Sequence, residues 1–161
     1  MNRIKNVKPT NRNYFQGYYN PINPEKYIGK LDEIIYRSSY EYRFCVYCDK
    51  TDRVIKWSSE PAAIKYYNPM DKKIHEYYVD FYVKLKGPED KDQDILVEVK
   101  PSRQLSKPVY EKKYMKAKSL KNYNKSCEMY IQNMSKWKAA KQFADERDMK
   151  FMIITEKNLG L

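Results

Sequence analysis

The sequence predicts an α/β domain in which α-helices flank a mixed β-sheet. The expected elements run helix, strand, strand, strand, helix, strand, helix, strand, an order that builds a sheet with helices packed on it. The chain has 161 residues, which fits one compact domain. Hydrophobic residues make up 42% of the chain and aromatic residues 15%, so there is enough apolar surface for a core and global disorder is not expected.

The first expected element is an irregular amino-terminal arm over residues 1–35. Prolines, glycines and asparagines interrupt every helical or strand period there. Its aromatic side chains are expected to pack on the domain and order part of the arm, with stacking on nucleic-acid bases as the alternative. The domain itself is expected over residues 36–161. Its first helix should run from Ser38 to about Asp49, because Ser38 and Glu41 have the spacing of a capping box.

Three strands are expected after this helix. The first covers residues 62–67 and ends at Asn68 and Pro69, which form a turn signal. The next two cover residues 77–85 and 94–100 and are rich in β-branched and aromatic residues. Because the stretch between them is polar and contains glycine and proline, these two strands are predicted to form a hairpin.

The carboxyl-terminal half predicts two helices and two strands. A lysine-rich helix is expected over residues 109–120, directly after a proline that a first helical turn tolerates. A short strand is expected over residues 127–132. Ser135 should cap a second helix that ends near Arg147. The mostly apolar stretch over residues 150–155 predicts a last strand that is covered on both faces.

The charge of the chain indicates a polyanionic partner. Lysine and arginine total 32 against 21 aspartate and glutamate, which gives a net charge of +11. Such an excess is typical of proteins that bind nucleic acid or an anionic surface. No run of about 18 apolar residues occurs, so no membrane-spanning helix and no membrane partner are expected. The first residues lack the apolar stretch of a secretion signal, and cytoplasmic synthesis is the expectation.

The cysteines and the one histidine argue against several kinds of site. Cys45 and Cys48 have the C-x-x-C spacing, but a zinc site would need a second pair of ligands, and Cys127 and His75 are all that remain. We therefore interpret the pair as buried helix packing and expect all three cysteines to be free thiols. One histidine also leaves little for a serine or cysteine triad.

The most informative residues lie in the two strands of the expected hairpin. Side chains two apart on a strand point to the same face, so Glu98 and Lys100 should lie together, opposite the valines that flank Glu98. If the two strands pair antiparallel, Asp80 falls close to both. Two carboxylates and an amine would then converge.

Two converging carboxylates favour a bound cation, because unit charges about 4 Å apart repel by roughly 4 kcal/mol at an effective dielectric constant of about 20. Hard oxygen ligands favour Mg²⁺, with Mn²⁺ as the alternative, and Mg²⁺ commonly keeps waters and contacts substrate phosphates. The ion would activate water for attack on a phosphodiester, while Lys100 orients or deprotonates the nucleophile. Glu41 could complete the cluster, although its capping-box role explains it without any chemistry.

The ordinary alternative is that Glu98 and Lys100 form a solvated strand face. Two features favour the site instead. Asp80 interrupts an otherwise aromatic and aliphatic strand, and Pro101 stops the next strand directly after Lys100.

These residues resemble a known group of nucleases. The succession Ser38-Ser39-Tyr40-Glu41, Val79-Asp80 and Val97-Glu98-Val99-Lys100-Pro101 is similar to the PD-(D/E)xK, or restriction-endonuclease-like, superfamily and its TnsA-type members. More narrowly, the chain from Tyr36 onward resembles the head completion nucleases of T4-like bacteriophages. Further segments that carry the resemblance are residues 57–61, 136–140 and 154–156.

The resemblance implies a restriction-endonuclease-like fold and metal-dependent cleavage of double-stranded DNA. It implies that the catalytic residues are Glu41, Asp80, Glu98 and Lys100, with Mg²⁺ or Mn²⁺ bound by the three carboxylates. Val79 stands where the family has a proline, which supplies no ligand. The implied role is to trim or finish the end of packaged DNA before neck and tail components attach. Phage head or neck proteins would be partners, in the host cytoplasm or on the virion.

DNA contact is expected from a stretch rich in lysine. Lysines and tyrosines interleave over residues 107–125, which fits phosphate contact and base stacking, while a solvated helix surface is the ordinary alternative. Trp57 and Trp137 are interpreted as packing residues. The expected DNA-binding lysines are Lys112, Lys113, Lys116, Lys136 and Lys138.

Two other functions stay open from the sequence. One is a non-catalytic, basic DNA-binding or virion neck protein that merely keeps the fold. The other is a transposon-end endonuclease of the TnsA type. Within the nuclease hypothesis, cleavage directed by DNA structure or ends is expected, because reading base edges usually needs a dedicated element for which a short single domain has little space.

Overall fold

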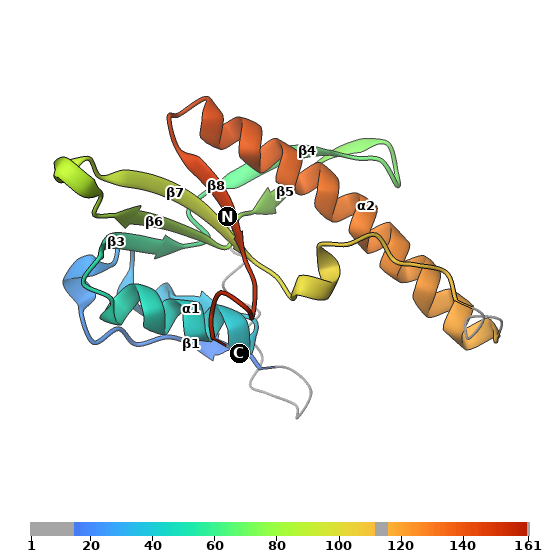
Figure 1. Cartoon of the computed structure of the whole chain (residues 1–161), viewed down its shortest axis with the longest axis horizontal. Coiled ribbons are helices and arrows are strands. Elements are labelled where there is room, and N and C mark those ends of the chain that lie inside the picture. The colour runs from blue at the N-terminus through green and yellow to red at the C-terminus, as the bar shows by residue number, and fades with distance from the viewer. Residues whose placement is uncertain (1–14, 112–115, 161) are drawn as a thin grey trace.

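The computed structural model describes residues 15–111 and 116–160 and shows a mixed sheet between two helices (Figure 1). Helices α1 (Ser39–Lys50) and α2 (Ala117–Asp145) pack on opposite faces of this sheet. β7 and β8 pair in parallel, whereas the other neighbours pair antiparallel, so the predicted α/β class is confirmed. The four strands lie in the order β3 (Val54–Ser59), β6 (Phe81–Leu85), β7 (Gln93–Val99) and β8 (Lys150–Ile154).

Alternating side chains of β7 contribute to a different core on each face of the sheet. Ile95, Val97 and Val99 pack with residues of α1. Leu96 points to the other face, where it packs with residues of α2. Glu98 follows on that second face, as the two-residue period requires. A carboxylate therefore stands where the strand would otherwise extend the apolar core.

The predicted capping box begins α1. Ser38 Oγ accepts a hydrogen bond from the Glu41 N–H at 3.1 Å and donates one to the Glu41 carboxylate, also at 3.1 Å. The helix ends at Lys50, close to the predicted end. Cys45 and Cys48 are buried free thiols within the core that α1 shares with the sheet, so the packing interpretation of this pair is confirmed.

One predicted strand is in fact two. The stretch 77–85 breaks at Asp80, and the residues before the break belong to β5 (Lys73–Tyr78). β5 pairs with β4 (Ala63–Asn68) in a hairpin of its own, whereas β6 pairs with β7 as predicted. At the break, the Asp80 carbonyl accepts a hydrogen bond from the N–H of Glu60 at 2.9 Å, which joins the start of β6 to the end of β3. Both ends of the β4–β5 hairpin thus leave the main sheet at one point.

The sequence prediction omits β3 and agrees with the position of β4 and β8. The expectation that the last strand is covered on both faces is wrong, because β8 lies at the edge of the sheet and Met152 is exposed. β3 has an irregular burial pattern, with Val54, Trp57 and Ser58 buried, so its sequence shows neither clean alternation nor a continuous apolar run. The turn between β6 and β7 contains a short 3-10 helix, η4 (Pro88–Asp90), and a second one, η5 (Ser102–Gln104), follows β7.

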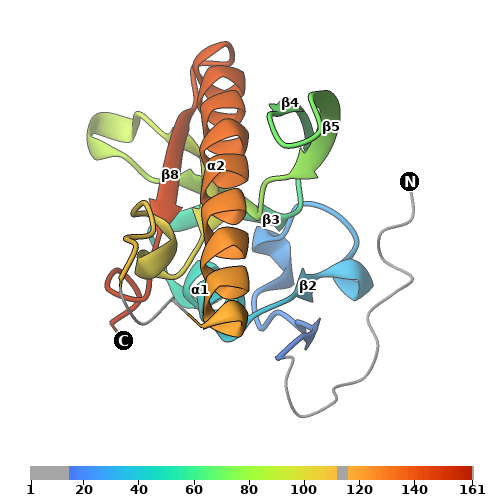
Figure 2. The same ribbon diagram turned by 90° about the vertical axis from the view of Figure 1, so that its right-hand side faces the viewer.

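The largest correction concerns α2. The predicted helix at 109–120, strand at 127–132 and helix from Ser135 are wrong as separate elements, because one helix of 29 residues spans Ala117–Asp145. At 1.5 Å per residue it is about 44 Å long. Its second half packs on the sheet and on β4, while its first half extends beyond the sheet (Figures 1 and 2).

The apolar run that suggested a strand follows the helical period instead. Tyr130, Asn133 and Trp137, three and four residues apart, are half-buried or buried, whereas Met129 and Ile131 are exposed. The helical period predicted for Trp137, Ala140 and Ala144 is confirmed, because these three are buried on one face. Among the described residues, no helix has the length and apolar character that crossing a membrane requires.

Packing orders the described part of the amino-terminal arm. Tyr19 is buried, and Tyr27 packs edge-on against Trp57 with ring centroids 4.8 Å apart, as expected for aromatic side chains of the arm. Trp57 is itself fully buried, which confirms its packing role. The regular elements of the arm are β1 (Gly17–Tyr18), η2 (Pro24–Lys26), η3 (Leu31–Glu33) and β2 (Ile35–Tyr36), with β1 paired to β2.

Candidate active site

The register of β6 and β7 brings the predicted site residues together. Phe81 pairs with Val97, so Asp80 comes to lie opposite Glu98. The Nζ atom of Lys100 lies 2.9 Å from Glu98 Oε1 and 3.6 Å from Asp80 Oδ2. The structure therefore contains the expected cluster of two carboxylates and one ammonium group.

Backbone groups hold Asp80 at the strand break. Its Oδ2 accepts a hydrogen bond from the Val99 N–H at 2.8 Å, while its carbonyl oxygen binds the Glu60 N–H. These two contacts tie the end of β7 and the end of β3 to the same residue. Contacts with the protein backbone thereby position the Asp80 carboxylate without a ligand.

Burial raises the pKa of each carboxyl group, and the charge of Asp80 adds to this effect at Glu41 and Glu98. Desolvation, followed by the charge of Asp80, raises the pKa of Glu98 to about 7, and the same causes raise the pKa of Glu41 to about 7. Burial also raises the pKa of Asp80, although Lys100 opposes this effect. For Lys100, burial disfavours the ammonium form, but the surrounding carboxylates outweigh it and raise its pKa well above the ordinary value.

Glu41 borders the cluster from the first turn of α1. Its carboxylate accepts hydrogen bonds from the Arg37 N–H at 2.7 Å and from Ser38 Oγ. The charges of Asp80 and Lys100 both shift its pKa, so it lies within their electrostatic reach. The helix-capping role is present, and its catalytic role stays a prediction.

Glu98 is buried but only half satisfied. The residue is 3% exposed, and its Oε2 has no hydrogen-bond partner among the described residues. Two buried donors, the Tyr77 hydroxyl and the Trp137 indole N–H, also lack partners in this part of the chain. Both lie near Glu98, whose charge, after burial, raises the pKa of Tyr77. The Trp137 indole N–H acts on Glu98 as a hydrogen-bond donor and opposes the rise of its pKa, but its geometry does not make a full hydrogen bond. An unsatisfied buried polar group costs about 1–3 kcal/mol, so this arrangement is not explained by stability.

The chemistry of the donors fits a hard divalent cation. Carboxylate oxygens are the ligands that Mg²⁺ and Mn²⁺ prefer, and Glu98 Oε2 is an acceptor without a donor. Across residues 15–111 and 116–160, no three Asp, Glu, His or Cys side chains converge tightly enough to form a ligand set by themselves. An ion held by Asp80 and Glu98 would therefore take its other ligands from water and substrate, as Mg²⁺ commonly does. Glu41 as a third ligand stays a prediction.

Sequence reasoning missed Arg37 and Glu60. Arg37 Nε lies 3.2 Å from Glu60 Oε1, and the charge of Glu60 contributes to the raised pKa that burial imposes on Asp80. Glu60 has a φ of 45°, in the left-handed region that residues other than glycine seldom adopt. Glu60 falls within the 57–61 stretch that carries the family resemblance, but its spacing alone gave no chemical reason to select it.

The DNA-contact lysines within the described residues do not share one face of α2. Lys116 and Lys138 are exposed. Lys136 is half-buried, with its Nζ 5.5 Å from the centroid of the Tyr66 ring and 5.9 Å from that of Tyr77. Side chains two apart on a helix point about 200° apart, so Lys136 and Lys138 face different ways.

A basic stripe does occur nearer the start of α2. Lys118, Lys121 and Lys125 are exposed, and their spacing of three and four residues places them on one side of the helix. Lys112 and Lys113 lie outside the described residues.

Two comparisons identify similar proteins. The family described as "TnsA-like endonuclease N terminal" matches residues 51–156 of this chain. The head completion nuclease of Enterobacteria phage T4 is 32% identical over 145 residues, which cover 90% of this chain and 93% of that protein. No solved structure matches. Asp80, Glu98 and Lys100 lie inside the range that the family matches, and Glu41 lies before it.

Proposed function

Because the chain belongs to the TnsA-like endonuclease family, it is a nuclease, and we propose that it hydrolyses DNA in a metal-dependent reaction at Asp80, Glu98 and Lys100. The observation that carries this proposal is the buried Glu98 Oε2, which accepts no hydrogen bond of full geometry in the described chain, although a second carboxylate and an ammonium group adjoin Glu98. A purely structural carboxylate would be expected to bind protein donors at both oxygens.

Each side chain of the cluster has a separate task in this proposal. Asp80 and Glu98 would hold Mg²⁺, or Mn²⁺, with Glu41 as the third carboxylate. When bound, the ion supplies positive charge that stabilises phosphoryl oxygens and activates water. Lys100 donates hydrogen bonds to a phosphate oxygen or to the attacking water and offsets negative charge that develops during cleavage.

The substrate proposed is double-stranded DNA. The net charge of +11 and the exposed stripe of Lys118, Lys121 and Lys125 on α2 favour a polyanion, and Lys116 and Lys138 add exposed positive charge. The name of the T4 relative supports a role in head completion. We therefore place the reaction at the end of packaged phage DNA, which would be trimmed before neck and tail components attach. Head or neck proteins would be partners, in the host cytoplasm or on the virion.

Incubation of the protein with supercoiled plasmid tests this proposal. The protein is expected to nick the plasmid with Mg²⁺ or Mn²⁺ and to stop when a chelator is added. Asp80→Asn should lose nicking by about a hundredfold or more, a typical effect of removing one electrostatic group from an active site. Asp145→Asn is a matched control, because Asp145 is an exposed carboxylate at the end of α2.

Two results would oppose the proposal. One is nicking that survives both the chelator and the Asp80→Asn change. The other is a folded wild-type protein that binds DNA but cleaves it with no divalent metal tested, which would favour a non-catalytic DNA-binding protein with the same fold.

A further inference from the structure

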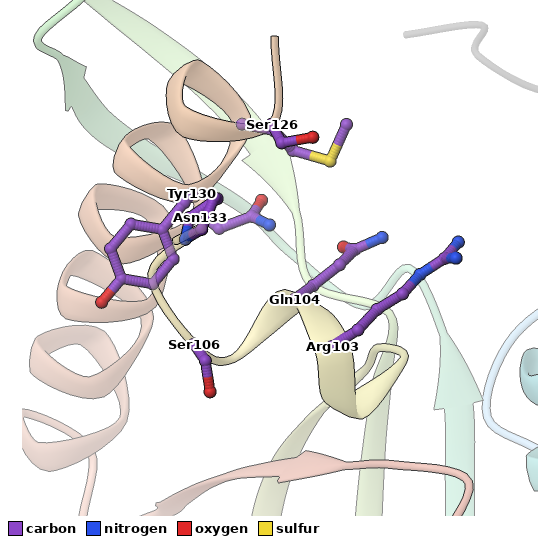
Figure 3. A pocket seen from close by; sticks show the side chains of 8 residues that line it. Arg103, Gln104, Ser106, Ser126, Tyr130 and Asn133 are labelled. Carbon is purple, nitrogen blue, oxygen red and sulfur yellow. The ribbon is translucent and has the colours of Figure 1, made fainter. Parts of the chain in front are cut away.

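A pocket of about 390 Å³ opens between α2 and the turn that follows β7 (Figure 3). Tyr130 and Asn133 line it from α2, while Arg103 and Gln104 line it from η5. None of these residues belongs to the proposed catalytic cluster. The full lining is Arg103, Gln104, Ser106, Pro108, Ser126, Met129, Tyr130 and Asn133.

Each wall of the pocket contains a residue that lies close in the chain to a residue at or near the catalytic cluster. Arg103 follows Lys100 by three residues in the chain. Asn133 precedes Trp137 by four residues, about 6 Å along the helix and on the same face, and the Trp137 indole lies near Glu98. The pocket therefore lies beside the site, where the buried face of α2 runs past the end of the sheet.

The wall formed by η5 is held in place from β8. The N–H of Ser102 donates a hydrogen bond to Glu156 at 2.8 Å, and the Ser102 hydroxyl donates to the same carboxylate. Glu156 follows the end of β8, which pairs with β7. The turn that carries Arg103 and Gln104 is thus anchored to the strand next to the catalytic one.

Four polar side chains that line the pocket have no polar partner among the described residues, whereas Ser126 donates a hydrogen bond to the Asn122 carbonyl oxygen. In the part of the chain that the structure describes, the side chains of Arg103, Gln104, Tyr130 and Asn133 make no hydrogen bond or ion pair. Asn133 is only 6% exposed. Its amide atoms are not among the sealed, unpartnered atoms of the described chain, so they open to the pocket and are free to bind a ligand there.

We propose that this pocket binds one unpaired nucleotide of the DNA strand next to the bond that is cleaved. The Tyr130 ring offers a surface on which a base can stack. The amides of Gln104 and Asn133 each present a donor and an acceptor, which match the mixed edge of a base. Arg103 offers its guanidinium group to a backbone phosphate. The proposal rests on the proposed nuclease function for the position of the cleaved bond.

The base in this pocket must be unpaired. Within a duplex, the edge that pairs is occupied and both faces are stacked, so neither the amides nor the tyrosine ring could reach them. An end with a single-stranded overhang supplies such a nucleotide at no cost, whereas a blunt end must first open. The pocket therefore makes the protein prefer frayed or overhanging ends.

Fluorescence anisotropy with two dye-labelled DNAs tests the pocket. One is a duplex with an oligothymidine overhang, and the other is a blunt duplex of the same sequence. Asp80→Asn serves as the background, without divalent metal, so that binding is measured apart from cleavage. Tyr130→Leu and Asn133→Leu should each weaken binding of the overhang about tenfold and leave the blunt duplex unchanged.

Two further variants serve as controls for folding and for surface substitution. Gln104→Ala removes an amide without touching α2, so it should weaken overhang binding even if Asn133→Leu fails to fold. Tyr47→Leu is a matched control, because Tyr47 is an exposed tyrosine of α1, and it should bind both DNAs as the background does. Equal weakening for both DNAs, or none for the overhang, would overturn the proposal. If the overhang effect holds and wild-type protein never nicks plasmid, the pocket stands and the catalytic proposal fails.

Discussion

Two buried carboxylates of this fold, Asp49 and Glu98, differ in how fully they are hydrogen-bonded. Both are almost sealed from solvent, at 0% and 3% exposure. The Asp49 carboxylate accepts hydrogen bonds from the Tyr19 hydroxyl and from the N–H groups of Ile22 and Asn23, at 2.7–2.8 Å. Glu98 is paired with Lys100 at one oxygen and has no partner at the other within the described residues.

The difference appears in the acidity of the two groups. Burial would raise the pKa of Asp49, but its hydrogen bonds outweigh burial and lower the pKa. Burial and the charge of Asp80 raise the pKa of Glu98 to about 7. Asp49 therefore stabilises the attachment of the arm to α1, whereas Glu98 costs stability. A buried carboxylate that the fold leaves unsatisfied is better explained by a ligand than by structure.

Glu98→Gln should reduce activity more than any other substitution considered below. Cleavage should fall by about a hundredfold to a thousandfold, as when one group is removed from an electrostatic site. Stability without metal should stay equal or rise, because the change removes a buried negative charge and leaves Lys100 beside Asp80. Plasmid nicking and thermal unfolding measure the two effects. A clear loss of stability would show that Glu98 is structural, like Asp49.

Asp49→Asn should show the reverse pattern. The amide cannot accept all three hydrogen bonds, so the free energy of unfolding should fall by about 3 kcal/mol, typical of breaking a buried charged network. Cleavage per folded molecule should stay unchanged, since no residue of the catalytic cluster touches Asp49. Urea unfolding and plasmid nicking below the midpoint provide the measurements. Unchanged stability would contradict the stabilising role assigned to the hydrogen bonds of Asp49.

The two carboxylates should also contribute to stability with opposite dependence on pH. The folded pKa of Asp49 is lowered, so its contribution is full above an unfolded pKa of about 4 and is lost as pH falls through the folded value. The folded pKa of Glu98 is raised from 4.5 to about 7. The carboxyl group therefore makes the folded state progressively less stable as pH rises through that window.

Unfolding curves of wild type, Asp49→Asn and Glu98→Gln, in the presence of a chelator, separate these contributions. The stability gap between wild type and Asp49→Asn should narrow in acid. Stability of wild type relative to Glu98→Gln should decline between about pH 4.5 and about pH 7. Parallel curves for all three proteins would contradict the assigned pKa directions.

Much of the catalytic cluster could be predicted because it depends on local rules. The two-residue period places Glu98 and Lys100 on one face, and antiparallel pairing of neighbouring strands brings Asp80 opposite. The capping box at Ser38 and Glu41 is equally local. The strand period, the pairing of neighbouring strands and the capping box each depend on residues close together in the chain, so they can be recognised in the sequence.

The features that sequence reasoning missed depend on distant contacts. Arg37 and Glu60 meet across 23 residues, and the Asp49 network joins residues 26–30 positions apart. The prediction of separate elements within α2 was wrong because residues 127–132 resemble a short strand by composition. Helix stability depends more on the packed face than on such propensities. The break between β5 and β6 likewise lies at a contact between distant residues, the hydrogen bond from the Glu60 N–H to the Asp80 carbonyl.

Manganese binding tests most directly whether Glu98 is left unsatisfied for a metal ion. The signal of free Mn²⁺ in electron paramagnetic resonance gives the affinity of folded protein without DNA or cleavage. Wild type and Asp49→Asn, in buffer where both are folded, are expected to bind Mn²⁺ equally, and Glu98→Gln to bind it at least about tenfold more weakly. Equal Mn²⁺ binding by wild type and Glu98→Gln would contradict the proposal that Glu98 is a metal ligand.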